Sequence, residues 1–220
     1  MSLYLVFIFA LLVILSFLAQ EYVNYVFQKW GKVSNDARLT GMQVAERIST
    51  SAGLGVELGV VDKKLGDHYD PQSHTVRLSA PVAGEASVSA MAIAAHELGH
   101  AQQQLDQPGM IRLRDVLVPA VRLAPTASYM LLFLGAVLGR LSLVWMGLGV
   151  LVLTTVFMLL TLPIEFDASR RALVLLDRNA MLSEADRRGA RQMLTAAALT
   201  YVVASVFSVV QLLRFIWLRR

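Results

Sequence analysis

Four long apolar runs constrain this chain more than any other feature of its sequence. A helix needs roughly 17–25 consecutive apolar residues to cross the hydrocarbon core of a bilayer. Hydrophobic residues make up 56% of the chain and charged residues only 16%, whereas about a quarter of a soluble domain is charged. The sequence therefore predicts an integral, multi-pass membrane protein with about four transmembrane helices, at 3–19, 116–138, 141–161 and 195–217.

The first run is expected to stay on the protein as an anchor. It is followed by Tyr22, Tyr25 and Trp30, which are typical of a membrane–water interface. A cleaved signal peptide is the alternative, but it would need a basic start and a small-x-small cleavage site. The chain starts with Met-Ser-Leu and shows no clear site of this kind.

The second and third runs predict a helical hairpin that turns at Gly139 and Arg140. The stretch 126–138 is too short to span a bilayer at a rise of about 1.5 Å per residue. The second helix must therefore extend back through Pro125 towards Pro119. We expect a kinked or partly interfacial entry there.

The four spans divide the chain into five parts. The anchor is 1–20, the membrane hairpin is 116–163 and the last helix is 195–220. The polar parts, 21–115 and 164–194, fall on one side of the membrane and both termini on the other. The two polar parts can therefore form one domain.

Basic residues near the span ends favour a cytoplasmic location for these polar parts, in the inner or plasma membrane of a bacterium. They are Lys29, Lys32, Arg112, Arg114, Arg170, Arg171, Arg187, Arg188 and Arg191. Four arginines on the other side oppose this orientation, namely Arg140, Arg214, Arg219 and Arg220. The net charge of +4 is accounted for by membrane anchoring, so the lipid bilayer is an expected partner and nucleic acid is not. Nothing in the sequence indicates an oligomeric state.

The first polar part combines helix and strand patterns. Apolar residues recur at helical spacing in 36–51, and short strands are expected at 55–61, 67–69 and 74–79. A second helix is predicted at 87–104, where Ser87 or Ser89 could be the N-cap. The fold class is therefore α+β and mostly helical, with a small sheet beside the transmembrane helices. The chain has no cysteine, so disulfides and thiolate metal sites are excluded.

The stretch AAHELGHAQQ (94–103) contains the first candidate site. His96 and His100 are four residues apart, so on a helix both imidazoles can face one metal ion. Glu97 is close enough to reach a water on that metal, as in the H-E-x-x-H motif of zinc peptidases. Two polar residues on an exposed helix face are the alternative, but the small apolar neighbours argue against exposure.

A third ligand is expected on another element, because catalytic zinc usually has three protein ligands. Glu165, in PIEFDASRRA (163–172), starts a predicted helix at 164–176 on the same side of the membrane. The alternative is that Glu165 and Asp167 are interfacial caps, since acids favour helix N-termini.

With these residues identified, the chain resembles the YugP family, described as "putative neutral zinc metallopeptidases". The resemblance rests on GDHYDPQSHTVRLS (66–79), AAHELGHAQQ (94–103) and PIEFDASRRA (163–172), and it covers nearly the whole chain. It implies a membrane-anchored, gluzincin-like peptidase related in layout to HtpX-like peptidases. The catalytic domain would be zincin-like, with a short mixed sheet packed on the H-E-x-x-H helix and the glutamate helix.

The resemblance also implies the roles of the site residues. His96, His100 and Glu165 would bind one Zn²⁺ per chain, and Glu97 would be the general base. HtpX-like peptidases have an aspartate four residues after the glutamate ligand, where this chain has Ser169. Ser169, Asp167 or a backbone carbonyl would then orient a zinc histidine.

Two further roles are expected in the block 66–79. The strand Val76, Arg77, Leu78 and Ser79 could lie at the edge of the cleft and pair with an extended substrate, or it could be an ordinary half-buried strand. His68 and Tyr69 could stabilise an oxyanion, or they could be a structural pair.

The resulting hypothesis is a zinc endopeptidase that cleaves protein or peptide substrates. A zinc-binding scaffold or regulator without turnover is the alternative, although a structural site has no need of Glu97. An intramembrane protease is a third hypothesis, but the segment before His96 is too short and polar to be a span.

Overall fold

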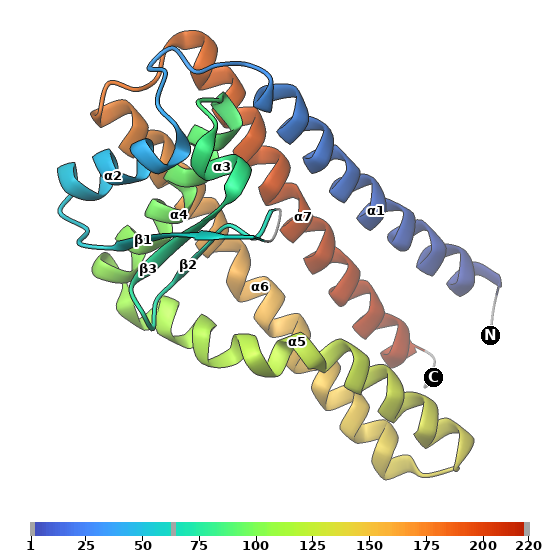
Figure 1. Ribbon diagram of the computed structural model, residues 1–220. Coiled ribbons are helices and arrows are strands. Elements are labelled where there is room, and N and C mark those ends of the chain that lie inside the picture. The colour runs from blue at the N-terminus through green and yellow to red at the C-terminus, as the bar shows by residue number, and fades with distance from the viewer. Residues whose placement is uncertain (1–2, 63–64, 218–220) are drawn as a thin grey trace. The chain divides into compact units, whose positions relative to one another are not determined.

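The computed structural model describes residues 3–62 and 65–217 (Figure 1). Arg219 and Arg220, counted above on the side of the membrane opposite the polar parts, lie outside these residues. The described chain forms two compact units. The first, the helical unit, comprises 1–18, 113–163 and 200–220, and the second, the mixed unit, comprises 19–112 and 164–199.

Four long helices contain the apolar runs. They are α1 (Leu3–Gly31), α5 (Pro108–Val137), α6 (Leu141–Arg178) and α7 (Glu184–Trp217). Three of them, over Phe7–Gly31, Leu141–Arg178 and Glu184–Arg214, are long and apolar enough to cross a membrane. The described chain has a fourth candidate span if Ile111–Val118 and Leu123–Val137 are counted together, and these two segments are bent by 50°. The bend lies where the sequence predicted a kinked entry.

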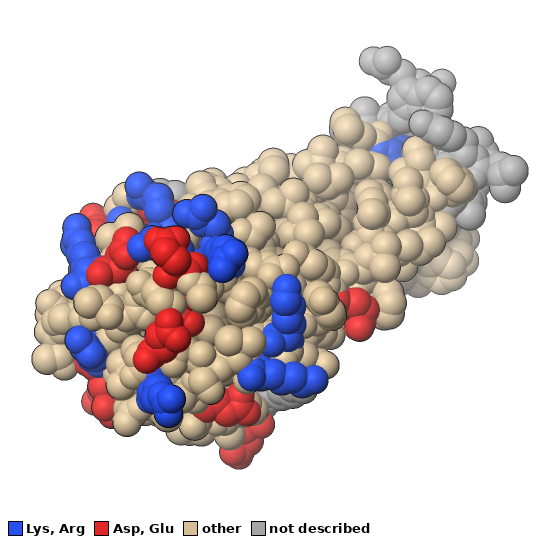
Figure 2. Space-filling model, turned by 90° about the horizontal axis from the view of Figure 1, so that it is seen from above, with Lys and Arg blue, Asp and Glu red and all other residues tan. Residues whose placement is uncertain are grey.

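The surface has the character that a membrane protein requires. Large hydrophobic side chains of the helical unit are exposed, including Phe7 and Phe133 at 66% and 67%. On the face shown in Figure 2, charged side chains crowd one region, and the other described residues are almost entirely tan. Apolar exposure on this scale suits contact with lipid rather than water.

The mixed unit contains a three-stranded sheet. Its strands are β1 (Glu57–Val61), β2 (His68–Asp70) and β3 (Thr75–Ser79), in the order β1-β3-β2. β1 runs parallel to β3, and β2 runs antiparallel to it. The α+β, mostly helical fold class with a small mixed sheet is therefore confirmed.

Two helices with strong N-caps pack beside this sheet. α2 (Gly41–Ser51) starts with a capping box in which Thr40 and Gln43 bond each other's backbone N–H. α4 (Val88–Asp106) is capped by Ser87, whose hydroxyl accepts from the Ala90 N–H. The short helix α3 (Ala80–Gly84) links β3 to α4.

The core of the mixed unit is built around α4. Its residues Ala90, Ala92, Ala94, Ala95 and Ala101 are at most 1% exposed. Small side chains let neighbouring elements approach closely, as the sequence indicated. α4 is thus buried on most sides, which is unusual for a helix that carries two histidines and a glutamate.

One predicted boundary is wrong. The sequence suggested a separate helix at 164–176 after the third span, but α6 continues through Pro163 without a break. A proline within a helix removes one backbone hydrogen bond, and spans tolerate it where neighbouring groups compensate. The last predicted span is likewise the second part of a longer helix, α7.

Candidate metal centre

The candidate metal centre lies where α4 and α6 cross. The crossing is close because Gly99 has no side chain: a Cβ there would lie 2.5 Å from the carbonyl oxygen of Ala168. His96 and His100 flank Gly99 on α4, and Glu165 precedes Ala168 by less than one turn of α6. The contact therefore brings three potential ligands from the two helices together.

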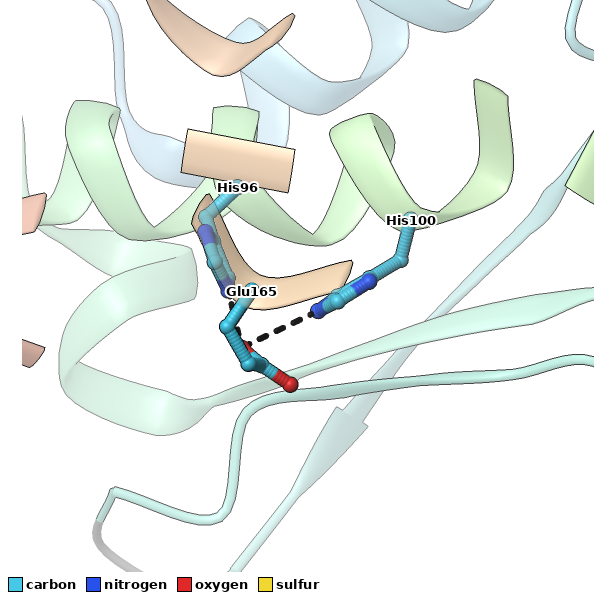
Figure 3. A group of neighbouring side chains, drawn as sticks. All are labelled: His96, His100 and Glu165. Atoms are coloured by element: carbon cyan, nitrogen blue, oxygen red, sulfur yellow. Dashed lines mark ion pairs between the residues drawn. The ribbon is translucent and has the colours of Figure 1, made fainter. Parts of the chain in front are cut away.

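The three side chains point towards one another (Figure 3). The Nε2 atoms of His96 and His100 lie 3.3 and 3.6 Å from Oε2 of Glu165. All three offer a ligand atom within 4.8 Å of the others. Their side chains are only 15%, 5% and 2% exposed, so the group is largely shielded from water.

These distances fit a small tetrahedral ion. Bonds of about 2.1 Å at tetrahedral angles place two ligand atoms roughly 3.4 Å apart, close to the two observed separations. The donor set of two imidazoles and one carboxylate is also that of many catalytic zinc sites. The residues present therefore fit the zinc ion that the sequence predicts.

Side-chain hydrogen bonds hold both histidines from behind. Nδ1 of His100 lies 3.0 Å from Oε1 of Gln103, and Nδ1 of His96 lies 3.3 Å from Oγ of Ser169. Ser169, one of the expected substitutes for the aspartate of HtpX-like peptidases, thus contacts a candidate zinc histidine directly. Gln103 was not singled out, although its spacing of three residues from His100 puts it on the same helix face.

Asp167 is connected to the same group. Its carboxylate accepts from Gln103 Nε2 at 2.9 Å and from Arg171 Nε at 2.6 Å, and it also pairs with Arg170. Burial opposes ionisation, but the hydrogen bonds from Arg170, Arg171 and Gln103 outweigh it and lower the pKa of Asp167 to about 2. Asp167 is therefore a stable anion beside the centre.

Glu97 lies on α4 next to His96 and is 7% exposed. A second carboxylate, Asp67, lies close enough to interact electrostatically with Glu97. Burial raises the pKa of Asp67, hydrogen bonds from Ser79 partly offset this, and the charge of Glu97 raises it further. Asp67 accepts from the Ser79 N–H at 2.7 Å, so the loop before β2 is fixed to the end of β3.

The predicted substrate strand lies at the centre of the sheet. β3 is the central strand, so its backbone pairs with β1 along its length and with β2 from Thr75 to Arg77. Val76 and Leu78 are fully buried, and Ser79 is bonded to Asp67. Over Val76 and Arg77 the strand has neighbours on both sides and no free row of backbone groups to offer a substrate, whereas Leu78 and Ser79 have a strand neighbour only in β1.

The two candidate oxyanion residues have structural contacts. The Tyr69 hydroxyl lies 2.6 Å from both His74 Nδ1 and Gln104 Oε1. The exposed His68 lies with Nδ1 2.7 Å from the Gly66 carbonyl oxygen. These contacts match the alternative of a structural role.

The fold and the site together describe a membrane protein with a candidate metal centre of two histidines and one glutamate on crossed helices. A family model described as "Putative neutral zinc metallopeptidase" matches residues 4–220, and the chain belongs to this family. It is also 39% identical over 203 residues to the "Putative membrane protease YugP" of Bacillus subtilis (strain 168), covering 92% of this chain and 90% of the relative. No solved structure matches it significantly. The family resemblance seen in the sequence is confirmed.

Proposed function

We propose that this protein is a membrane-anchored zinc endopeptidase. The observation that carries the proposal is the convergence of His96, His100 and Glu165 at distances suited to one zinc ion, with Glu97 adjacent on the same helix. A bound zinc ion would lower the pKa of a water towards neutrality and polarise the scissile carbonyl.

Glu97 is the proposed general base. Its carboxylate takes a proton from the attacking water and passes it to the leaving amine. Its low exposure keeps it in a poorly solvated position, where a charge acts more strongly than in water. Asp67 adds a second acidic group on this side of the helix.

The extended substrate is proposed to bind along β2, which is one of the two edge strands of the sheet. Strand addition provides affinity through backbone hydrogen bonds, and β2 follows directly after Asp67, which lies near Glu97. A photo-crosslinking residue at the exposed His68, in the Glu97→Gln background, should capture a substrate peptide. The same residue at Val60, exposed on the other edge strand β1, is the matched control. Capture at Val60 alone would assign the substrate to β1 instead.

The deciding experiment is cleavage of casein by the detergent-purified, zinc-loaded full chain. The wild type should produce internal cleavages, whereas the Glu97→Gln variant and a chelator-treated sample should not. Glu97→Gln should still bind zinc, because this residue is not one of the ligands. A wild type that binds zinc but cleaves neither casein nor membrane-proximal peptides would favour the alternative, a zinc-binding scaffold without turnover.

The orientation is proposed to be cytoplasmic for the mixed unit. Residues 19–112 and 164–199 form one unit, as expected if both lie on the same side of the membrane. The chain has no cysteine, so single cysteines introduced at exposed positions give unambiguous labelling. A cysteine at the exposed Glu85 should react with an impermeant maleimide only after the cells are opened. Labelling of intact cells would show that the mixed unit has the opposite orientation.

A further inference from the structure

Gln103 has an unusual set of partners for an uncharged side chain. It lies on α4, is 3% exposed, and uses both ends of its amide. Its Oε1 faces His100 Nδ1 at 3.0 Å, and its Nε2 lies 2.8 Å from the Ile164 carbonyl oxygen and 2.9 Å from Asp167 Oδ2. One side chain thus contacts a candidate ligand on α4 and two groups of α6.

The orientation of this amide is determined by its partners. The Ile164 carbonyl can only accept hydrogen bonds, and the Asp167 carboxylate already accepts them from Arg170 and Arg171, so the amide nitrogen must face both groups. The amide oxygen must then face His100, where it can only accept.

The consequence for His100 is a defined tautomer. Because Oε1 of Gln103 is an acceptor, Nδ1 of His100 carries the proton. In the neutral ring, Nε2 then has its lone pair directed at Glu165, whose Oε2 is 3.6 Å away. That arrangement is the one needed to bind a cation, since neutral imidazole binds metals through an unprotonated nitrogen.

The same network extends along α6 and returns to α4. Asp167 pairs with Arg170 and Arg171, and Arg171 also pairs with Asp106 at the end of α4. A continuous chain of bonds therefore runs from His100 through Gln103, Asp167 and Arg171 to Asp106. It joins the two helices on the side of the crossing that follows His100.

We propose that Gln103 is a positioning residue of the metal centre. It fixes the proton of His100 on Nδ1 and keeps Glu165 on α6 in register with the two histidines on α4. The proposal rests on the proposed metal site but not on proteolysis, so the two can fail separately.

The test compares neighbouring glutamines in the full-length protein. Gln104 bonds Tyr69 and the Pro71 carbonyl, so Gln104→Leu is the matched control for Gln103→Leu. Zinc affinity is measured by competition with a chelator, and cobalt substitution reports ligand geometry through its absorption spectrum. Gln103→Leu should bind zinc about 10–100-fold more weakly with an altered cobalt spectrum, and Gln104→Leu should match the wild type in both.

A second pair of variants keeps the proposal testable if Gln103→Leu does not fold. Gln103→Glu retains an acceptor for His100 but places a carboxylate against Asp167, so zinc affinity should fall. Adding Asp167→Asn restores a donor opposite the new carboxylate and should recover part of that affinity, which a general packing role would not predict.

The outcomes are separable. Wild-type affinity and spectrum in Gln103→Leu, or equal affinities of Gln103→Glu with and without Asp167→Asn, would overturn the positioning role. A wild type that does not bind zinc at all would instead refute the proposed metal site.

Discussion

The two units satisfy their polar side chains in different ways. In the helical unit, hydroxyls donate to backbone carbonyls, often of the same helix, as Ser16 does to Leu12 and Thr154 to Val150. In the mixed unit, side chains bond other side chains far away in sequence, as Gln103 bonds Asp167 and Ser169 contacts His96. A span has no water to satisfy its polar groups and uses backbone carbonyls instead, whereas the mixed unit uses side-chain pairs that join distant segments, including those of the proposed metal centre. Substitutions should therefore have larger effects in the mixed unit.

The largest effect is expected for Glu165→Gln. At a free zinc concentration 100 times the Kd, binding stabilises a protein by about 2.7 kcal/mol, and the variant should lose most of this. Thermal unfolding with and without zinc measures the loss. Asp177→Asn is the control on the same helix, because Asp177 pairs at the surface with Arg187. If Glu165→Gln keeps its zinc-dependent stabilisation, Glu165 is not a ligand.

A comparison of two glycines comes next. Ala at Gly99 would press a methyl group against the Ala168 carbonyl, so Gly99→Ala should cost about 1–3 kcal/mol and weaken zinc binding. Gly149 lies on α6 in the helical unit, and apart from the backbone of its own helix no described atom is within 4 Å of a Cβ added there. Gly149→Ala should therefore be neutral or stabilising by up to about 1 kcal/mol. Equal unfolding temperatures for the two variants would contradict a close helix crossing.

A smaller effect is expected from acid. The pKa of Asp167 in the folded protein is about 2, below its ordinary value of 3.8, so the folded state holds the carboxylate ionised more strongly than the unfolded state does. This contribution to stability is fully present above about pH 4 and is lost as the pH falls through 2. Both proteins are measured with a chelator present. Between pH 4 and 2, the unfolding temperature of Asp167→Asn should therefore depend less on pH than that of the wild type. If the unfolding temperatures of the two proteins change equally with pH, ionisation of Asp167 does not contribute to the stability of the folded state.

The smallest effect is expected within the helical unit. The Ser128 hydroxyl donates to the Gly147 carbonyl at 2.8 Å and so links α5 to α6. Hydrogen bonds between spans contribute about 0.6 kcal/mol on average, so Ser128→Ala should shift the unfolding temperature only slightly. If Ser128→Ala lowers the unfolding temperature as much as Gly99→Ala does, substitutions do not have larger effects in the mixed unit than in the helical unit.

Sequence alone predicted the features that depend on local spacing. Apolar runs gave the spans, and the four-residue spacing of His96 and His100 gave a shared helix face. Glu165 could be proposed because it follows a span on the expected side of the membrane. In the structure these three residues do lie together.

Features that depend on pairing between distant segments were not predictable. The place of β3 at the centre of the sheet depends on which strands pair with it, and neither neighbour's position can be read from the alternation in 74–79. Gln103 was missed for a related reason. Its spacing put it on the correct face, but its importance depends on Asp167, 64 residues later. The continuity of α6 through Pro163 was missed because a proline usually indicates a helix boundary.

The glycine at the helix crossing has a consequence for the choice of ion. With no side chain between Gly99 and the Ala168 backbone, α4 and α6 are at contact distance, so the spacing of His96, His100 and Glu165 is set by the backbones. Bonds of about 2.0–2.2 Å suit that spacing, whereas calcium needs six to eight oxygen ligands at about 2.3–2.6 Å. If the centre binds zinc as proposed, the absence of one methyl group at Gly99 would thus favour a small ion that accepts nitrogen ligands.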